Sequence, residues 1–315
     1  MDVPSAELLN EKFFKFVVGP SKKEFTVHAD VFAKLSDPLN VLINGNFSEA
    51  TEKTVVWDDV DEATFDRLRQ FAYSGDYQGA IPVPLAQWAE DKLKPGEIPT
   101  AEFKASIDKY RTFVSRKHPR NKDNYRWKLP YTIGNMYDDL NDYQTATVTR
   151  KRKYEDFADE ITLDGKALMI RALVLWFNFN PELKEKRMRL IYDNVEGEPF
   201  HNYKDLLYCH ANLHILADRY CIEKLVDITT IKLVELLFRV AIFEWNLGHI
   251  ADVIRYIFQN TLDGDQIRGG LIRFGAVIID DVQENKEWAQ LLLDVPEFSK
   301  GVIEKLVKHR LPESY

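Results

Sequence analysis

Residues 14–28 read FKFVVGPSKKEFTVH, and the fold can be worked out from this segment onward. Apolar residues occupy every second position on both sides of the segment 19–23, whose glycine and proline are typical of turns. The alternating residues are Phe14, Phe16 and Val18 before the turn, and Phe25 and Val27 after it. A period of two places these side chains on one face of a strand. The pattern predicts a β-hairpin over 13–28 with one buried face.

Short elements of both kinds are expected between the hairpin and residue 77. One short helix follows directly, and a second has Asp37 as its N-cap, Pro38 at its first position and Gly45 at its end. Residues 54–57 are strong strand formers, and Asp61 caps a longer helix. The apolar residues of these helices are Val31, Phe32, Leu35, Leu39, Leu42, Ile43, Phe65, Leu68, Phe71 and Ala72. We therefore predict a small sheet accompanied by short helices.

The sequence becomes helical in pattern from residue 205 onward. Apolar residues recur three and four positions apart, which places them on one face of a helix. The stripe of the first helix is Leu206, Cys209, Leu213, Leu216, Ala217 and Tyr220; later stripes lie in 231–242, 250–258 and 271–279, and the last is Val302, Ile303, Leu306 and Val307. This region is predicted to be all helical.

Residues 79–204 differ in character from both flanking regions. Between 92 and 128 there are 11 Lys and Arg against 4 Asp and Glu, with aromatic residues interleaved. Such a mixture can contact phosphates and stack on bases, and 150–153 also fits a nuclear-import signal of low specificity. We interpret the segment as a basic, partly ordered insertion that faces solvent or other proteins.

Three motifs lie in the first 77 residues and a fourth follows the insertion. They are Phe25-x-Val27-His28-Ala29-x-Val31-Phe32-x-x-x-Ser36, Leu42-x-x-Gly45-x-Phe47-x-Glu49, Phe65-x-x-Leu68-x-x-Phe71-x-Tyr73-Ser74-Gly75-Asp76-Tyr77, and His210-Ala211-x-Leu213-x-Ile215-Leu216-Ala217-Asp218-Arg219-Tyr220-x-Ile222-x-x-Leu225. In this order and at this spacing, they resemble a BTB/POZ domain. The long insertion and the helical tail are similar to the BTB proteins abundant in filamentous fungi.

The resemblance implies an α+β chain: a BTB/POZ fold, in which a small sheet is flanked by short helices, followed by an all-helical C-terminal region. The domains expected from it are the N-terminal part of the BTB/POZ domain over 1–78, the insertion over 79–204, the C-terminal BTB/POZ helices over 205–240 and a helical extension over 241–315.

The same resemblance implies binding to other proteins. Many family members recruit a cullin scaffold of a ubiquitin ligase, often through a hydrophobic-x-Glu motif, and Phe47-Ser48-Glu49 fits that motif. The alternative is that Phe47 packs locally and Glu49 is solvated. Homodimers are common in the family and form through an exchanged N-terminal strand or helix. Dimerisation stays open here, because only about 12 residues precede the hairpin, of which 4–12 could form one short helix carrying Leu8 and Leu9.

The composition of the chain argues against several other classes of protein. A formal charge of −8 argues against nucleic acid as a partner of the whole chain. The longest apolar stretch, 168–179, is too short to span a bilayer, and no secretory signal is visible. With two cysteines there is no disulfide framework. We expect an intracellular protein of the cytoplasm or nucleus, without a membrane partner.

Chemistry-bearing residues are sparse. Cys209, His210, His214 and Cys221 suggest zinc, but Cys221 lies too far along the helix to join the others, so a buried cysteine and two histidines on the helix flank are expected instead. No phosphate-binding loop or nucleophile motif occurs. We predict no enzymatic activity, no catalytic residue, no cofactor and no metal.

The functional prediction is a non-enzymatic adaptor that docks one partner on its BTB fold and selects a client through the insertion or the helical tail. Such an adaptor works by tethering, because it raises the concentration of one partner near the other. The alternative is a dimeric structural or regulatory scaffold without a ligase link, which uses the basic insertion to bind an anionic partner.

Overall fold

The computed structural model describes residues 12–84, 201–240, 244–282 and 284–310. Its N-terminal part contains a three-stranded sheet of order β2-β1-β3, formed by β1 (Phe13–Val18), β2 (Lys23–His28) and β3 (Thr54–Trp57). β1 pairs antiparallel with β2, with Phe16 opposite Phe25, and parallel with β3. The predicted hairpin and strand are confirmed, since the alternating apolar residues are buried on one face.

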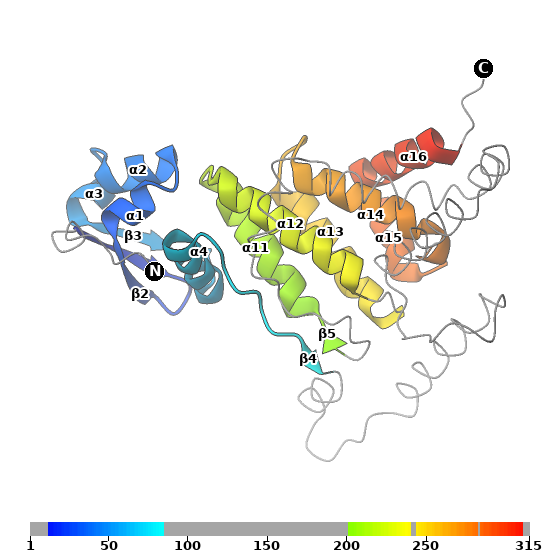
Figure 1. The fold of residues 1–315 in the computed structure, drawn as a ribbon, viewed down its shortest axis with the longest axis horizontal. Coiled ribbons are helices and arrows are strands. Elements are labelled where there is room, and N and C mark those ends of the chain that lie inside the picture. The colour runs from blue at the N-terminus through cyan, green and yellow to red at the C-terminus, as the bar shows by residue number, and fades with distance from the viewer. Residues whose placement is uncertain (1–11, 85–200, 241–243, 283, 311–315) are drawn as a thin grey trace, which may run out of the picture.

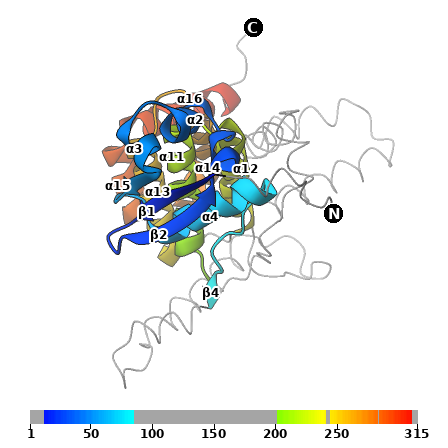
Figure 2. The ribbon, with the colours of Figure 1, turned by 90° about the vertical axis from the view of Figure 1, so that its left-hand side faces the viewer.

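Four helices accompany the sheet: α1 (Ala29–Ala33), α2 (Asp37–Asn44), α3 (Ser48–Glu52) and α4 (Glu62–Ser74) (Figures 1 and 2). Asp61 caps α4 as predicted, because its carboxylate accepts the Thr64 N–H at 2.9 Å. Gly75 ends α4 at φ +78°, a left-handed conformation that favours glycine. The N-cap of α2 is Ser36 and not Asp37, because the Ser36 hydroxyl reaches the Leu39 N–H at 3.3 Å.

Aromatic rings fill the core between the sheet and these helices. The ring of Phe16 lies 4.8 Å from that of Trp57, 5.0 Å from Phe65 and 5.5 Å from Phe32. All four residues are buried. Pairs of rings at these separations add to the stability that burial provides.

The two ends of the insertion meet. A two-stranded antiparallel ladder joins β4 (Val83–Pro84) to β5 (His201–Asn202), with Val83 opposite Asn202. The chain therefore leaves the N-terminal unit and returns at one place. Residues 85–200, and with them the basic segments 92–128 and 150–153, lie outside the described residues.

The C-terminal part is a two-layer stack of helices (Figure 1). The helices are α11 (Lys204–Arg219), α12 (Glu223–Arg239), α13 (Glu244–Asn260), α14 (Gln266–Val282), α15 (Lys286–Asp294) and α16 (Pro296–Arg310). α11, α13 and α15 pack in one layer, and α12, α14 and α16 pack in the other. The predicted α+β class, a small sheet with short helices and then an all-helical region, is confirmed.

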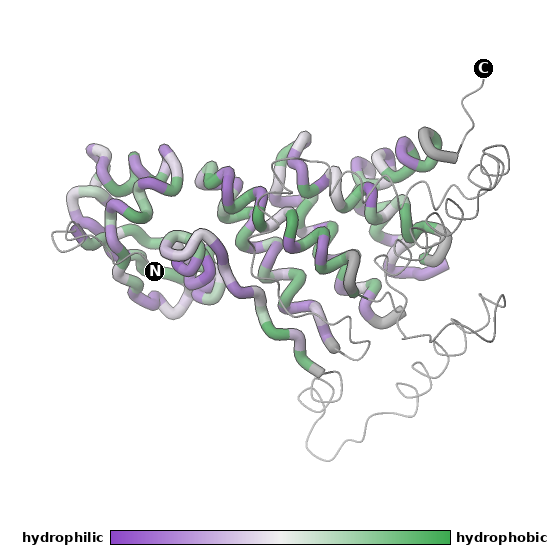
Figure 3. The backbone as a smooth tube through the Cα atoms, viewed as in Figure 1, coloured by the Kyte–Doolittle hydropathy of each residue, from purple (hydrophilic) through white to green (hydrophobic). Residues whose placement is uncertain are grey.

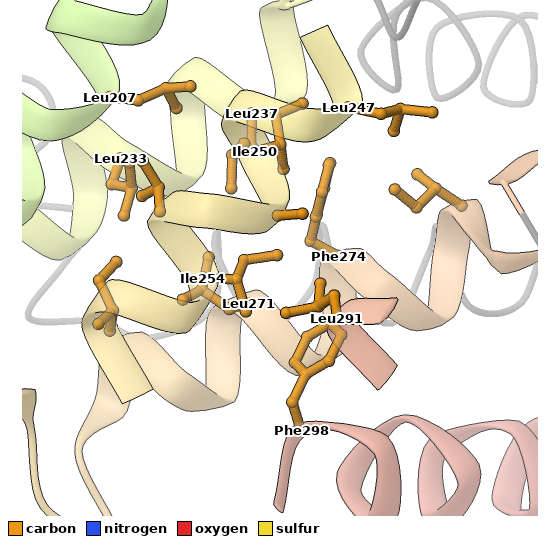
Figure 4. Close-up of a cluster of buried hydrophobic side chains, with 14 of the residues drawn as sticks. Leu207, Leu233, Leu237, Leu247, Ile250, Ile254, Leu271, Phe274, Leu291 and Phe298 are labelled. Atoms are coloured by element: carbon orange, nitrogen blue, oxygen red, sulfur yellow. The ribbon is translucent and has the colours of Figure 1, made fainter. Parts of the chain in front are cut away.

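α11 belongs to both parts, since it is buried on opposite sides. Cys209, Leu213 and Leu216 join the aromatic core, and α11 also packs against α4. Leu206 and Leu207 face the other way, into the aliphatic core of the stack that includes Leu233, Ile254, Leu271 and Phe298 (Figure 4). α12 does the same, with Leu225 and Ile228 in the aromatic core and Leu233 in the aliphatic one, so the two cores share these two helices.

The last helix departs from the expected pattern. Apolar and polar residues alternate along the helices of the stack (Figure 3), and Val302 of α16 is buried as predicted. Ile303 and Val307 are instead 58% and 51% exposed. α16 packs mainly on α14 and α15, and Phe298 at its start also contacts Phe258 of α13, so the side of α16 that carries Ile303 and Val307 is left uncovered.

Candidate functional site

The predicted docking residues lie where α3 begins: Phe47 on the turn that follows α2, and Glu49 in the first turn of α3. Gly45 ends α2, and Phe47 is the N-cap of α3 with extended backbone angles (φ −82°, ψ 163°). The Phe47 carbonyl accepts hydrogen bonds from the N–H and hydroxyl of Thr51, each at 3.3 Å. The backbone of Phe47 is therefore held by α3, while its side chain is left for other contacts.

The Phe47 side chain does not pack locally. It is 61% exposed, so the alternative of a locally packed ring is wrong. An exposed aromatic ring is a common anchor in protein interfaces, because it buries a large apolar area when a partner covers it.

Glu49 stands in the first turn of α3, two residues after Phe47, and is half-buried. One oxygen of its carboxylate accepts the Ser48 hydroxyl at 3.0 Å. Among the described residues, the other oxygen has no hydrogen-bond or ion-pair partner, and an ionised carboxylate has further lone pairs to offer a donor. The turn thus presents an apolar ring and an acceptor side by side in sequence.

The four residues considered as zinc ligands, Cys209, His210, His214 and Cys221, form no metal site among the described residues. Cys209 is buried, as predicted, and Cys221 is exposed at the turn between α11 and α12. His210 and His214 are fully buried, not placed on the helix flank as expected. Among the described residues no three His, Cys, Asp or Glu side chains gather as metal ligands would.

His210 contacts the N-terminal unit. Its Nδ1 lies 2.7 Å from the Tyr77 hydroxyl, and the Tyr77 ring in turn lies 4.2 Å from the Lys232 ammonium. Lys232 forms a buried ion pair with Asp76 at 2.9 Å. This network could not be predicted from the sequence, because it joins Asp76 and Tyr77 to residues of α11 and α12 that lie more than a hundred positions further along the chain.

His214 lies in a second buried network. Its two ring nitrogens face the Thr229 hydroxyl at 2.9 Å and the Asp265 carboxylate at 3.0 Å. The order hydroxyl, imidazole, carboxylate is that of a hydrolase triad. However, Thr229 and His214 are 0% exposed, so the hydroxyl is closed to any substrate in this conformation.

The adjacent carboxylates Asp58 and Asp59 form ion pairs at the surface. Asp58 pairs with Lys22 and Asp59 pairs with Arg219. Residues 4–11, on which the dimer prediction depended, lie outside the described residues. In the part of the chain that is described, every helix is too short or too polar to cross a bilayer.

Comparison with known proteins leaves the chain without an assigned family, since no family model and no curated protein matches it.

Proposed function

We propose that this chain is an adaptor of BTB/POZ type that docks a cullin scaffold through Phe47 and Glu49. The observation that carries the proposal is the exposed Phe47 ring, two residues before a carboxylate, on a turn with a fixed backbone. A rigid apolar anchor beside an acceptor is well suited to binding a helix of a partner.

The order of elements supports the BTB/POZ assignment. Two strands, two helices, a strand and a long helix succeed one another, as the resemblance implies, with the short α3 added before β3. The motif residues have structural roles in it. His28 joins β2 to α1, and its N–H donates to the Tyr73 hydroxyl at 3.1 Å.

The adaptor would work by holding two partners on one rigid body. α11 connects the sheet unit to the helical stack through two cores, so a client on the stack would keep a fixed position relative to a scaffold at Phe47. Tethering of this kind raises effective concentration and requires no chemistry from the chain.

The test is a binding measurement with purified chain and the N-terminal domain of a fungal cullin. The double variant Phe47→Ala/Glu49→Ala should weaken binding by about 30-fold or more, as expected when central anchors of an interface are removed. Surface substitutions of this kind leave the core intact, and circular dichroism would check that both proteins are folded.

The matched control is Ile303→Ala/Glu304→Ala, which also removes an exposed apolar residue and a neighbouring carboxylate. This control should retain cullin binding. If wild type binds no cullin, the ligase link fails and the scaffold alternative takes its place. If wild type and the Phe47 variant bind equally, the docking site is wrong.

A further inference from the structure

The turn that carries Phe47 passes very close to the end of α2. Gly45 ends this helix, and its N–H donates to the Val41 carbonyl at 2.9 Å. The backbone angles of Gly45, φ −75° and ψ −163°, are extended and do not by themselves require glycine. The space around it does, because an added Cβ would lie less than 3.0 Å from the Val41 carbonyl oxygen. Glycine is therefore needed at position 45 for the close approach of two backbone segments.

The Val41 carbonyl cannot turn aside in the way that a flexible side chain can. It belongs to the backbone of α2 and accepts the hydrogen bond that ends the helix. The Val41 side chain is at an ordinary distance, with Cγ1 3.5 Å from the added Cβ. A side chain at position 45 therefore has to move either α2 or the turn that follows it.

α2 is anchored in the core, whereas the turn after it is not. Leu39 and Ile43 of α2 are buried among the aromatic rings, and the Ser36 hydroxyl caps the start of the helix. None of residues 45–54 is buried, and the next buried residue is Val55 on β3. Strain at position 45 is therefore released by movement of the turn and α3, while the core stays packed.

The turn and α3 would move as one piece. The N–H and hydroxyl of Thr51 both donate to the Phe47 carbonyl. The Ser48 hydroxyl donates to the Glu49 carboxylate. These bonds lie within 47–51, so they hold the two docking residues to each other and not to α2. The position of the docking residues relative to α2 depends on the close approach at Gly45.

We propose that Gly45 is the positioning residue of the docking site, which sets where Phe47 and Glu49 stand on the surface without itself touching the partner. This inference rests on the function proposed above. Binding groups have to be held within about 0.5 Å of their working positions, and a turn pushed away by a side chain at position 45 does not hold them there. Gly45→Ala should thus weaken docking while the fold remains.

The first test measures affinity for the N-terminal domain of a fungal cullin, at a temperature well below the Tm of each variant. Gly45→Ala should raise the Kd by about 10-fold or more, at unchanged stoichiometry. Asn46→Ala changes the exposed neighbour of Gly45 and should bind as wild type does. Gly275→Ala should also bind as wild type does, although it places a Cβ 2.5 Å from Cζ of Phe298 in the stack and lowers the Tm.

The second test needs no partner. In nitrogen-15 spectra, Gly45→Ala should shift the amide signals of α3 as far as Thr51, while the signals of Leu39 and of the sheet stay in place. Asn46→Ala is the control and should shift only the signals of its neighbours in sequence.

The two tests distinguish a failure of this inference from a failure of the proposed function. If wild type binds no cullin, the docking function fails, and the amide signals alone decide the role of Gly45. Unmoved α3 signals, wild-type affinity of Gly45→Ala, or an equal loss of affinity in Gly275→Ala would each overturn the inference. A Gly45→Ala chain that does not fold would also overturn it, because the strain would then have reached the core.

Discussion

The N-terminal unit and the helical stack fill their cores with different kinds of side chain. Short strands and helices of 4 to 13 residues leave irregular spaces in the first unit, and rings such as Phe16, Trp57 and Phe65 fill them. Helices of 9 to 17 residues lie side by side in the stack, where aliphatic residues such as Leu233 and Ile254 predominate. The difference suggests that burial of aromatic rings stabilises the N-terminal unit. Close packing between helices stabilises the stack.

The ion pairs of the two parts also differ in how deeply they are buried. Ion pairs of the N-terminal unit, such as Lys23 with Glu62, lie at the surface, and pairs of this kind contribute little. The junction between the two parts buries one, the pair of Lys232 with Asp76, although other pairs of the stack, such as Lys300 with Glu304, lie at the surface. Removing one partner of a buried pair leaves an uncompensated charge, so these positions tolerate less change.

The largest effect is expected from the centre of the aromatic core. Phe65→Ala should lower the free energy of unfolding by about 3–5 kcal/mol, because the ring is 0% exposed and contacts several others. Since α11 is common to both cores, we expect hydrogen exchange to accelerate in α4 and in α15 together.

The control for that experiment is Val56→Ala, an exposed residue on β3, which should change stability by no more than about 0.5 kcal/mol. Acceleration confined to α4 would show that the two parts unfold separately, and the comparison would then describe two domains instead of one cooperative body.

Strands and helices that bury only one face could be predicted well from the sequence. The hairpin, β3 and α4 each have one apolar face, so alternation or helical spacing identifies them. α11 is buried on two sides, and the residues of its second side, including His210 and His214, were assigned to the flank. Periodicity detects a contrast between faces, and this contrast weakens when both faces are covered.

The candidate site was also predicted in part. Phe47 and Glu49 could be named from a motif, but the exposure of Phe47 depends on how α2 and α3 fold. The partners of His214 could not be named, since Asp265 lies 51 residues further on and meets it only through the packing of α14. Long-range polar pairs leave no periodic signal in one sequence.

A smaller effect is expected from a glycine at a close contact between two helices of the stack. Gly275 of α14 faces α16, and an added Cβ would lie 2.5 Å from Cζ of Phe298. Gly275→Ala should therefore destabilise the chain by about 1–3 kcal/mol in urea unfolding, because a close-packed contact must open.

Gly248→Ala in α13 is the matched control, since its Cβ would meet only Cγ of Glu287 at 3.7 Å, an ordinary contact. Alanine favours a helix over glycine, so this change should stabilise by about 0.5–1 kcal/mol. Equal signs for the two variants would contradict the view that close helix contact at Gly275 holds the stack together.

The smallest effect is expected from an exposed carboxylate. The hydrogen bond from the Ser21 hydroxyl, with a further contribution from Lys23, lowers the pKa of Glu62 below the ordinary 4.5. Stability from a lowered pKa is present above 4.5 and is lost as the pH falls through the folded value. Ser21→Ala should move the pKa of Glu62 upward in an NMR titration of its carboxyl carbon, whereas Thr26→Ala, on the outer face of the same hairpin, should leave it in place. Because Glu62 is in contact with solvent, the Tm of Ser21→Ala at neutral pH should stay close to that of wild type. A Tm loss of about 4 °C or more for Ser21→Ala would mean that surface pairs matter as much as buried ones, and the contrast between the two parts would fail.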